Sequence, residues 1–158
     1  MANVVIRRIV PGSQELAWHL LSDLDRMGEW MPDITSVEHV DGPRRALGRQ
    51  QKSILKDGSE FHHRVVNWDD SRRLAWRVER HLVDGREVSG FYNQRTTIDL
   101  RPVGPDTELT VTSTWSAGNP VAWLRSFSEK GRVRQRFEAA LEAIDSILRA
   151  GEQPPTDP

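Results

Sequence analysis

The sequence contains no cysteine. Its absence excludes disulfides, thiolate metal sites, cysteine-held iron–sulfur clusters and a cysteine nucleophile. A long apolar run is missing too, since no segment approaches the ~18–20 residues that a membrane-spanning helix needs. The first eight residues lack the basic-then-apolar order of a signal peptide. We therefore expect a cytoplasmic protein without a membrane span.

An excess of charge of one sign is also missing. The chain has 22 lysines and arginines against 23 acidic residues, a formal net charge of −1. A general nucleic-acid binder is usually basic, so we expect no nucleic-acid partner. The adjacent His62 and His63 would point to opposite faces of a strand and could not converge on one ion. We therefore expect no bound metal.

What remains is enough chain for one globular domain. The 158 residues are 37% hydrophobic and 28% charged, which suits a single core. We assign residues 1–150 to one domain and expect residues 151–158 to be a disordered tail. The β-branched segment 3–10 predicts a strand. Ser13 then offers an N-cap to a helix, and a second short helical turn follows over residues 23–27.

The middle of the chain predicts six strands with short connections. Asp57-Gly58 and Asp84-Gly85 are typical hairpin turns between alternating runs. Connections this short favour consecutive antiparallel strands over parallel crossovers. The expected strands cover residues 34–41, 48–57, 59–68, 73–82, 87–101 and 107–116.

The last third changes to a helical period. Asn119-Pro120 predicts a cap with proline at the first helical position. An apolar stripe then recurs at 3.6-residue spacing. We expect Gly131 to kink this helix and Gly151 to end it. The stripe consists of Val133, Phe137, Ala140, Leu141, Ile144 and Leu148.

This order of elements resembles the helix-grip fold of the START/Bet v 1-like superfamily, in its polyketide cyclase/dehydrase branch. The fold class is α+β, with a curved antiparallel sheet of about seven strands wrapped around a long C-terminal helix. The resemblance implies a cavity between sheet and helix for a hydrophobic or aromatic small molecule, without a cofactor. The local features that carry it are Ala17-Trp18, residues 28–32, Arg64-Val65-Val66, residues 72–76 and residues 104–110.

Strand alternation predicts which side chains line such a cavity. In the last strand Ser113 and Trp115 share a face with two apolar residues, so we expect them to point inward. The inward phase of the preceding strand brings Gln94 and Tyr92 to the same face. Trp76 belongs to the apolar phase of its strand.

The segment 59–68 has no clear phase by itself. Here the resemblance decides, because aromatase/cyclases of this type carry an inward arginine on the corresponding strand. That places Arg64 in the cavity, with His62 and Glu60 on the same face. The comparison also puts Ile34 where those enzymes carry a cavity tyrosine, which weighs against the same aromatising chemistry.

These placements assign roles. Arg64 would hold an enolate or carbonyl oxygen, and His62 would move protons. Tyr92 would orient hydroxyl groups and could assist Arg64 in enolisation or dehydration. The predicted ligand-binding residues are Trp30, Glu60, Trp76, Gln94, Ser113, Trp115 and Phe127.

Three hypotheses for function follow. The first is a cofactor-independent polyketide cyclase/aromatase-like enzyme that works mainly by folding its substrate. The second is a non-catalytic carrier or sensor of a lipid, quinone or aromatic metabolite. The third is a co-chaperone-like partner role, which needs an exposed apolar patch that the sequence does not clearly show. Either a monomer or a homodimer is compatible with the sequence.

Overall fold

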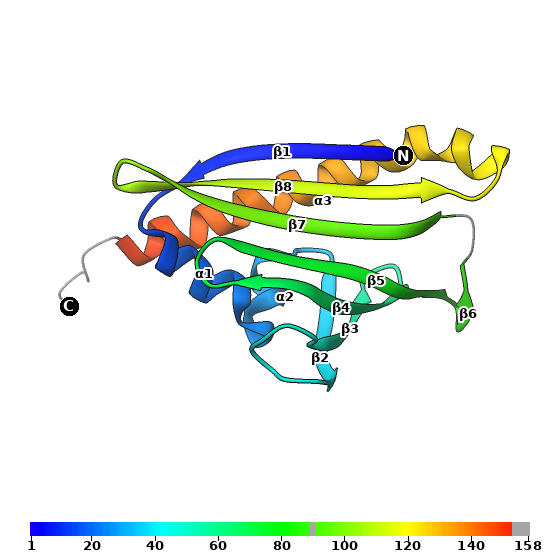
Figure 1. Ribbon diagram of the computed structural model, residues 1–158, viewed down its shortest axis with the longest axis horizontal. Helices are drawn as coiled ribbons and strands as arrows, with labels where there is room; N and C mark the ends of the chain where they lie inside the picture. The colour runs from blue at the N-terminus through cyan, green and yellow to red at the C-terminus, as the bar shows by residue number, and fades with distance from the viewer. Residues whose placement is uncertain (89–90, 153–158) are drawn as a thin grey trace.

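The structure is a computed structural model that describes residues 1–88 and 91–152, without the side chains of Phe91, Tyr92 and Glu152. The order of elements is the predicted one, with the two-residue strand β6 in addition to the six strands expected after the short helices (Figure 1). They are β1 (Ala2–Val10), α1 (Gln14–Ser22), the 3-10 helix η1 (Leu24–Arg26), α2 (Met27–Trp30), β2 (Ile34–Asp41), β3 (Gln50–Leu55), β4 (Glu60–Asp69), β5 (Arg73–Val83), β6 (Arg86–Glu87), β7 (Phe91–Val103), β8 (Asp106–Ala117) and α3 (Pro120–Glu152).

The strands form one antiparallel sheet that α3 covers. The sheet order is β1-β8-β7-β5-β4-β3-β2, with the two-residue β6 paired to β5. In Figure 1 α3 runs along one face of the sheet behind β1, β8 and β7, and α1 and α2 lie beneath its C-terminal part. The predicted α+β helix-grip fold is therefore confirmed. Within the described residues, none of the helices is long and apolar enough to cross a bilayer.

Local signals position the helices as expected. The Ser13 hydroxyl accepts a hydrogen bond from the Leu16 amide at the start of α1, and Asn119 Oδ1 accepts one from the Ala122 amide at 2.8 Å. The helix α3 is continuous from Pro120 to Glu152, so Gly131 does not interrupt it, and the kink expected there stays a prediction. The described helix includes Gly151 and extends one residue past this predicted stop, to Glu152. The rest of the expected tail, 153–158, lies outside the described residues.

The core forms where the inner face of the sheet meets α3. Leu109 and Ile98 of the sheet are almost fully buried there, as are Leu141 and Ile144 of the helix. Two ion pairs reinforce the packing, because Asp145 of α3 binds Arg8 of β1 at 2.7 Å, and Arg136 binds Asp33 at 2.7 Å. Hydrophobic burial and these pairs together hold the helix across the sheet.

Two turn glycines give a test of this architecture. Gly42 and Gly58 both adopt positive φ, but a Cβ added at Gly42 would overlap the carbonyl oxygen of Gly48, whereas one at Gly58 meets nothing within 4 Å. Gly58→Ala should cost only the conformational term, about 1 kcal/mol of unfolding free energy. Gly42→Ala should cost at least about 1 kcal/mol more, because backbone must shift. Chemical denaturation measures both, and equal losses would contradict this reading of the β2–β3 connection.

Candidate functional site

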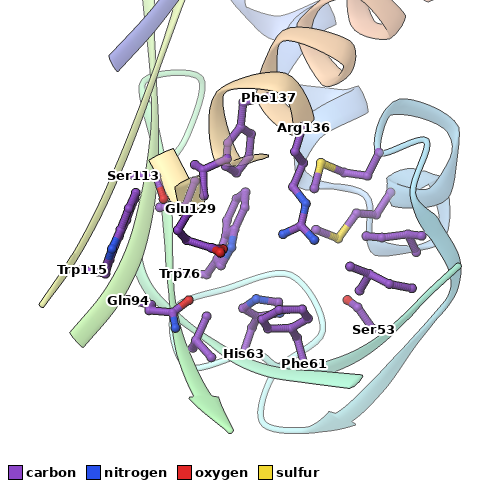
Figure 2. Close-up of a pocket in the computed structure, with 17 residues that line it drawn as sticks. Ser53, Phe61, His63, Trp76, Gln94, Ser113, Trp115, Glu129, Arg136 and Phe137 are labelled. Atoms are coloured by element: carbon purple, nitrogen blue, oxygen red, sulfur yellow. Dashed lines mark hydrogen bonds between the residues drawn. The ribbon is translucent and has the colours of Figure 1, made fainter. Parts of the chain in front are cut away.

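A cavity of about 90 Å³ lies between α3 and the inner face of the sheet. Its walls are mostly apolar and come from elements far apart in the sequence (Figure 2). Trp76 of β5 and Trp115 of β8 lie on the sheet side, and Phe137 is contributed by α3. Met27 and Met31 close the side next to α2. The fold therefore builds a mainly hydrophobic space, as a ligand site requires.

Three polar atoms of this cavity lack a partner. Ser53 Oγ, His63 Nδ1 and Trp115 Nε1 are buried and make no hydrogen bond within the part of the chain that the structure describes. By contrast, the neighbouring hydroxyls of Thr96 and Ser113 pair with each other at 3.2 Å. Each unsatisfied buried group costs about 1–3 kcal/mol, so such groups are rare in ordinary cores.

His63 is neutral at physiological pH. Burial and, to a smaller extent, the nearby charges of Arg136, His62 and His81 together lower the pKa of its imidazole from 6.5 to about 3. The ring stacks on Phe61 with centroids 5.7 Å apart. Phe61 in turn stacks on His81 at 4.1 Å. A neutral imidazole can donate or accept a hydrogen bond but takes up a proton only in strong acid.

Charged side chains of α3 lie at the mouth of the cavity. The Arg136 guanidinium is 5.5 Å from the centroid of the Phe61 ring and is ion-paired with Asp33. Glu129 also lines the cavity and lies 3.8 Å from Arg132. A second, more open hollow of about 330 Å³ shares Phe61, Glu129 and Arg136 with the cavity. These shared residues therefore mark the passage from solvent to the cavity.

Comparison with known proteins agrees with this arrangement. A family profile described as "Polyketide cyclase / dehydrase and lipid transport" matches residues 1–149. The chain belongs to this family. No curated protein matches the sequence.

Solved structures share the fold at low sequence identity. A START superfamily protein from Mycobacterium smegmatis is 17% identical with a TM-score of 0.75, over 94% of this chain and 97% of that one. The Aha1 dimer from Colwellia psychrerythraea is 15% identical with a TM-score of 0.68, over 97% and 100%. DynU16, from the dynemicin biosynthetic locus, is 18% identical with a TM-score of 0.67, over 94% of this chain and 48% of that one.

Strand β4 is in the opposite phase to the one inferred from the family resemblance. Arg64 binds Glu79 at 2.6 Å with 43% of its side chain exposed, and His62 binds Glu60 at 3.0 Å. The predicted inward orientation of Glu60, His62 and Arg64 is therefore wrong. The reason is the pairing of β4, which sets His63 opposite the buried Gln51 of β3. Directly opposed residues of an antiparallel pair share a face.

The other predicted site residues divide into three groups. Those that line the cavity are Trp76, Gln94, Ser113 and Trp115, and their part in binding stays a prediction. Trp30 is buried in the core and does not line the cavity, and Phe127 is 60% exposed on α3, so neither placement is as expected. The side chain of Tyr92 lies outside the described residues.

Sequence reasoning missed several residues of the cavity. Phe61 and His63 could have been found, because the set Phe61, His63 and Val65 is more apolar than the alternate set. Arg136 lies three residues after Val133 and next to Phe137, so helical spacing already put it beside the inward stripe. Ile34, which the resemblance set at the position of a cavity tyrosine, does line the cavity. Among the described residues no three His, Asp or Glu side chains are grouped to hold a metal ion.

The neutral state of His63 predicts how stability depends on pH. The pKa of His63 is lower in the folded than in the unfolded protein, so the unfolded state binds more protons between about pH 3 and 6.5. The folded protein is therefore most stable, as far as His63 is concerned, above pH 6.5. Its free energy of unfolding falls as the pH falls below this value, by up to about 1.4 kcal/mol per pH unit. His63→Phe should flatten the dependence between ~pH 5 and ~pH 6.5.

Denaturant titrations across this pH range measure the effect. The control variant is His81→Phe. Burial also lowers the pKa of the His81 imidazole, although His81 is only partly buried. We expect a smaller change from His81→Phe. A pH dependence that His63→Phe leaves unaltered would show that this imidazole is not held neutral.

Proposed function

We propose that this chain binds a compact, mostly apolar small molecule that carries a neutral hydrogen-bonding group, as a carrier or sensor. The observation that supports it is the set of unpartnered buried polar atoms on three residues that line one mostly apolar cavity, Ser53, His63 and Trp115. A bound hydroxyl or carbonyl would satisfy them and remove their desolvation cost.

The size of the cavity limits the ligand. At about 90 Å³ it is smaller than the roughly 150 Å³ cavity that binds benzene in an engineered protein. A single ring therefore needs a modest movement of the wall. Met27 and Met31 can supply it, because unbranched thioether side chains change shape easily. A multi-ring polyketide would need a much larger rearrangement.

The polar atoms also limit the charge of the ligand. Trp115 Nε1 only donates, whereas the Ser53 hydroxyl and the neutral His63 can donate or accept. An anion in this apolar space would need a free cation beside it. Arg136, the basic residue that lines the cavity, is already paired with Asp33. A ketone, an alcohol or a phenol therefore suits the site better than a carboxylate.

Binding without catalysis is favoured by the state of His63. A general base works best with a pKa near the working pH, and the pKa of His63 is about 3. The second candidate is a cyclase-like enzyme, which the family description and one observation favour. Glu129 and Arg136 line the same cavity and could act on an enolisable carbonyl there.

A ketone and its matched hydrocarbon test the proposal. In NMR titrations the protein should bind acetophenone about fivefold more tightly than ethylbenzene, since one hydrogen bond contributes about 1 kcal/mol. Ser53→Ala, His63→Phe and Trp115→Phe each remove one of the three unpartnered atoms, and at least one should bring this preference close to unity. His19→Phe, on an exposed ring of α1, is the control. Absence of a preference, or one that all three variants retain, would contradict the proposal.

Turnover separates the two candidates. We expect no acceleration over buffer when a linear poly-β-ketone thioester is incubated with the protein and followed by mass spectrometry. An acceleration that Glu129→Gln abolishes would establish the cyclase-like reaction instead. Native mass spectrometry of the protein as purified adds the mass of any retained compound.

A further inference from the structure

The first half of α3 carries its large apolar side chains on the outside. Val121, Trp123, Leu124 and Phe127 are each 57–66% exposed. Trp123 and Phe127 make an edge-to-face contact with centroids 5.2 Å apart, so they form one continuous ridge. The side chains turned inward in the same segment are the small Ala122 and Ser126. A helix that only covers a core carries its large apolar side chains on the inner side, so this arrangement is reversed.

A basic surface continues this ridge along the same side of the helix. Trp123, Phe127, Lys130 and Arg134 follow at spacings of four, three and four residues, which places them on one side of α3. Arg134 is exposed and Lys130 is half-buried. Residues 120–136 contain five basic residues and the single acidic Glu129, although the whole chain has a net charge of −1. The positive charge is therefore concentrated beside the apolar ridge.

This segment is at a free end of the molecule. Figure 1 shows the first turns of α3, in yellow, at the end of the molecule near the start of β1 and away from α1 and α2. A surface formed by one exposed helix can approach a flat partner without a clash from the rest of the fold. Exposed tryptophan, phenylalanine and leucine beside lysine and arginine are the composition of helices that lie in a membrane interface.

We propose that residues 121–134 dock the protein on the surface of an anionic lipid bilayer. The four apolar side chains enter the boundary between headgroups and acyl chains, and Lys130 and Arg134 contact the anionic headgroups. This inference goes beyond ligand binding and does not rest on it. Glu129 within this segment and Arg136 just after it line the cavity from the side of α3 turned toward the sheet, so the docking surface and the cavity residues occupy different sides of the same helix.

Co-sedimentation of the full chain with vesicles tests the proposal. Binding should be at least tenfold tighter to phosphatidylcholine vesicles with ~30% phosphatidylserine than to pure phosphatidylcholine. It should weaken when sodium chloride rises from ~0.1 M to ~0.5 M. The double variants Trp123→Ser/Phe127→Ser and Lys130→Glu/Arg134→Glu should each lose at least tenfold of the affinity.

Matched variants elsewhere control for general effects. Leu47→Ser removes an equally exposed apolar side chain, and Lys56→Glu reverses an exposed charge, and both should bind vesicles as the wild type does. Thermal melts check that every variant is folded. Because the acetophenone titration needs no vesicles, a Trp123→Ser/Phe127→Ser protein should keep the ketone preference while losing the bilayer.

Two results would overturn the proposal. One is vesicle binding that is absent or independent of phosphatidylserine. The other is a homodimer in sedimentation velocity that the Trp123→Ser/Phe127→Ser variant dissociates, because a second copy would then cover the ridge.

Discussion

One helix has to cover one concave sheet face, and the rest of this structure depends on how well it does so. Over its second half α3 fills the space with Leu141 and Ile144, and Asp145 fixes that end to Arg8 of β1. Earlier along the helix the inward positions hold Val133 and charged residues of the cavity mouth, so the sheet and helix are not fully in contact. The cavity is the space that this incomplete contact leaves. Its place is thus set by which turns of α3 carry bulky apolar side chains.

The polar atoms in that space are costly to the folded protein. An apolar cavity of this size could be lined by carbon alone, and a core built for stability would be. Here Ser53, His63 and Trp115 each present a buried polar atom without a protein partner. Because His63 is held neutral, the free energy of unfolding also falls in acid. Local violations of polar satisfaction are expected where a protein binds something, and among the described residues three of the six buried side-chain atoms without a hydrogen bond belong to residues that line this cavity.

The sequence was sufficient for the fold because period and punctuation agree along most of the chain. It failed in β4, where either phase of residues 60–65 brings one histidine inward. The family resemblance chose the phase with Arg64, although an inward arginine would have needed a buried partner. The structure instead pairs Arg64 with Glu79 on the outer face, so the more apolar set with Phe61 lies inside. The prediction that Phe127 lines the cavity was wrong for another reason. A hydrophobic side chain is not always buried, so its hydrophobicity alone does not place it in the core.

The two halves of α3 therefore have different relations to the rest of the molecule. In the second half the apolar stripe faces the sheet and acidic residues such as Glu138 and Glu142 face solvent. In the first half Ala122 and Ser126 face the sheet and Trp123 and Phe127 face outward. A helix needed only as a lid gains nothing from this reversal, since exposed aromatics add no core packing and favour aggregation. The reversal is explained if the first half of α3 covers the surface of a partner. Its basic residues indicate that this partner surface is negatively charged.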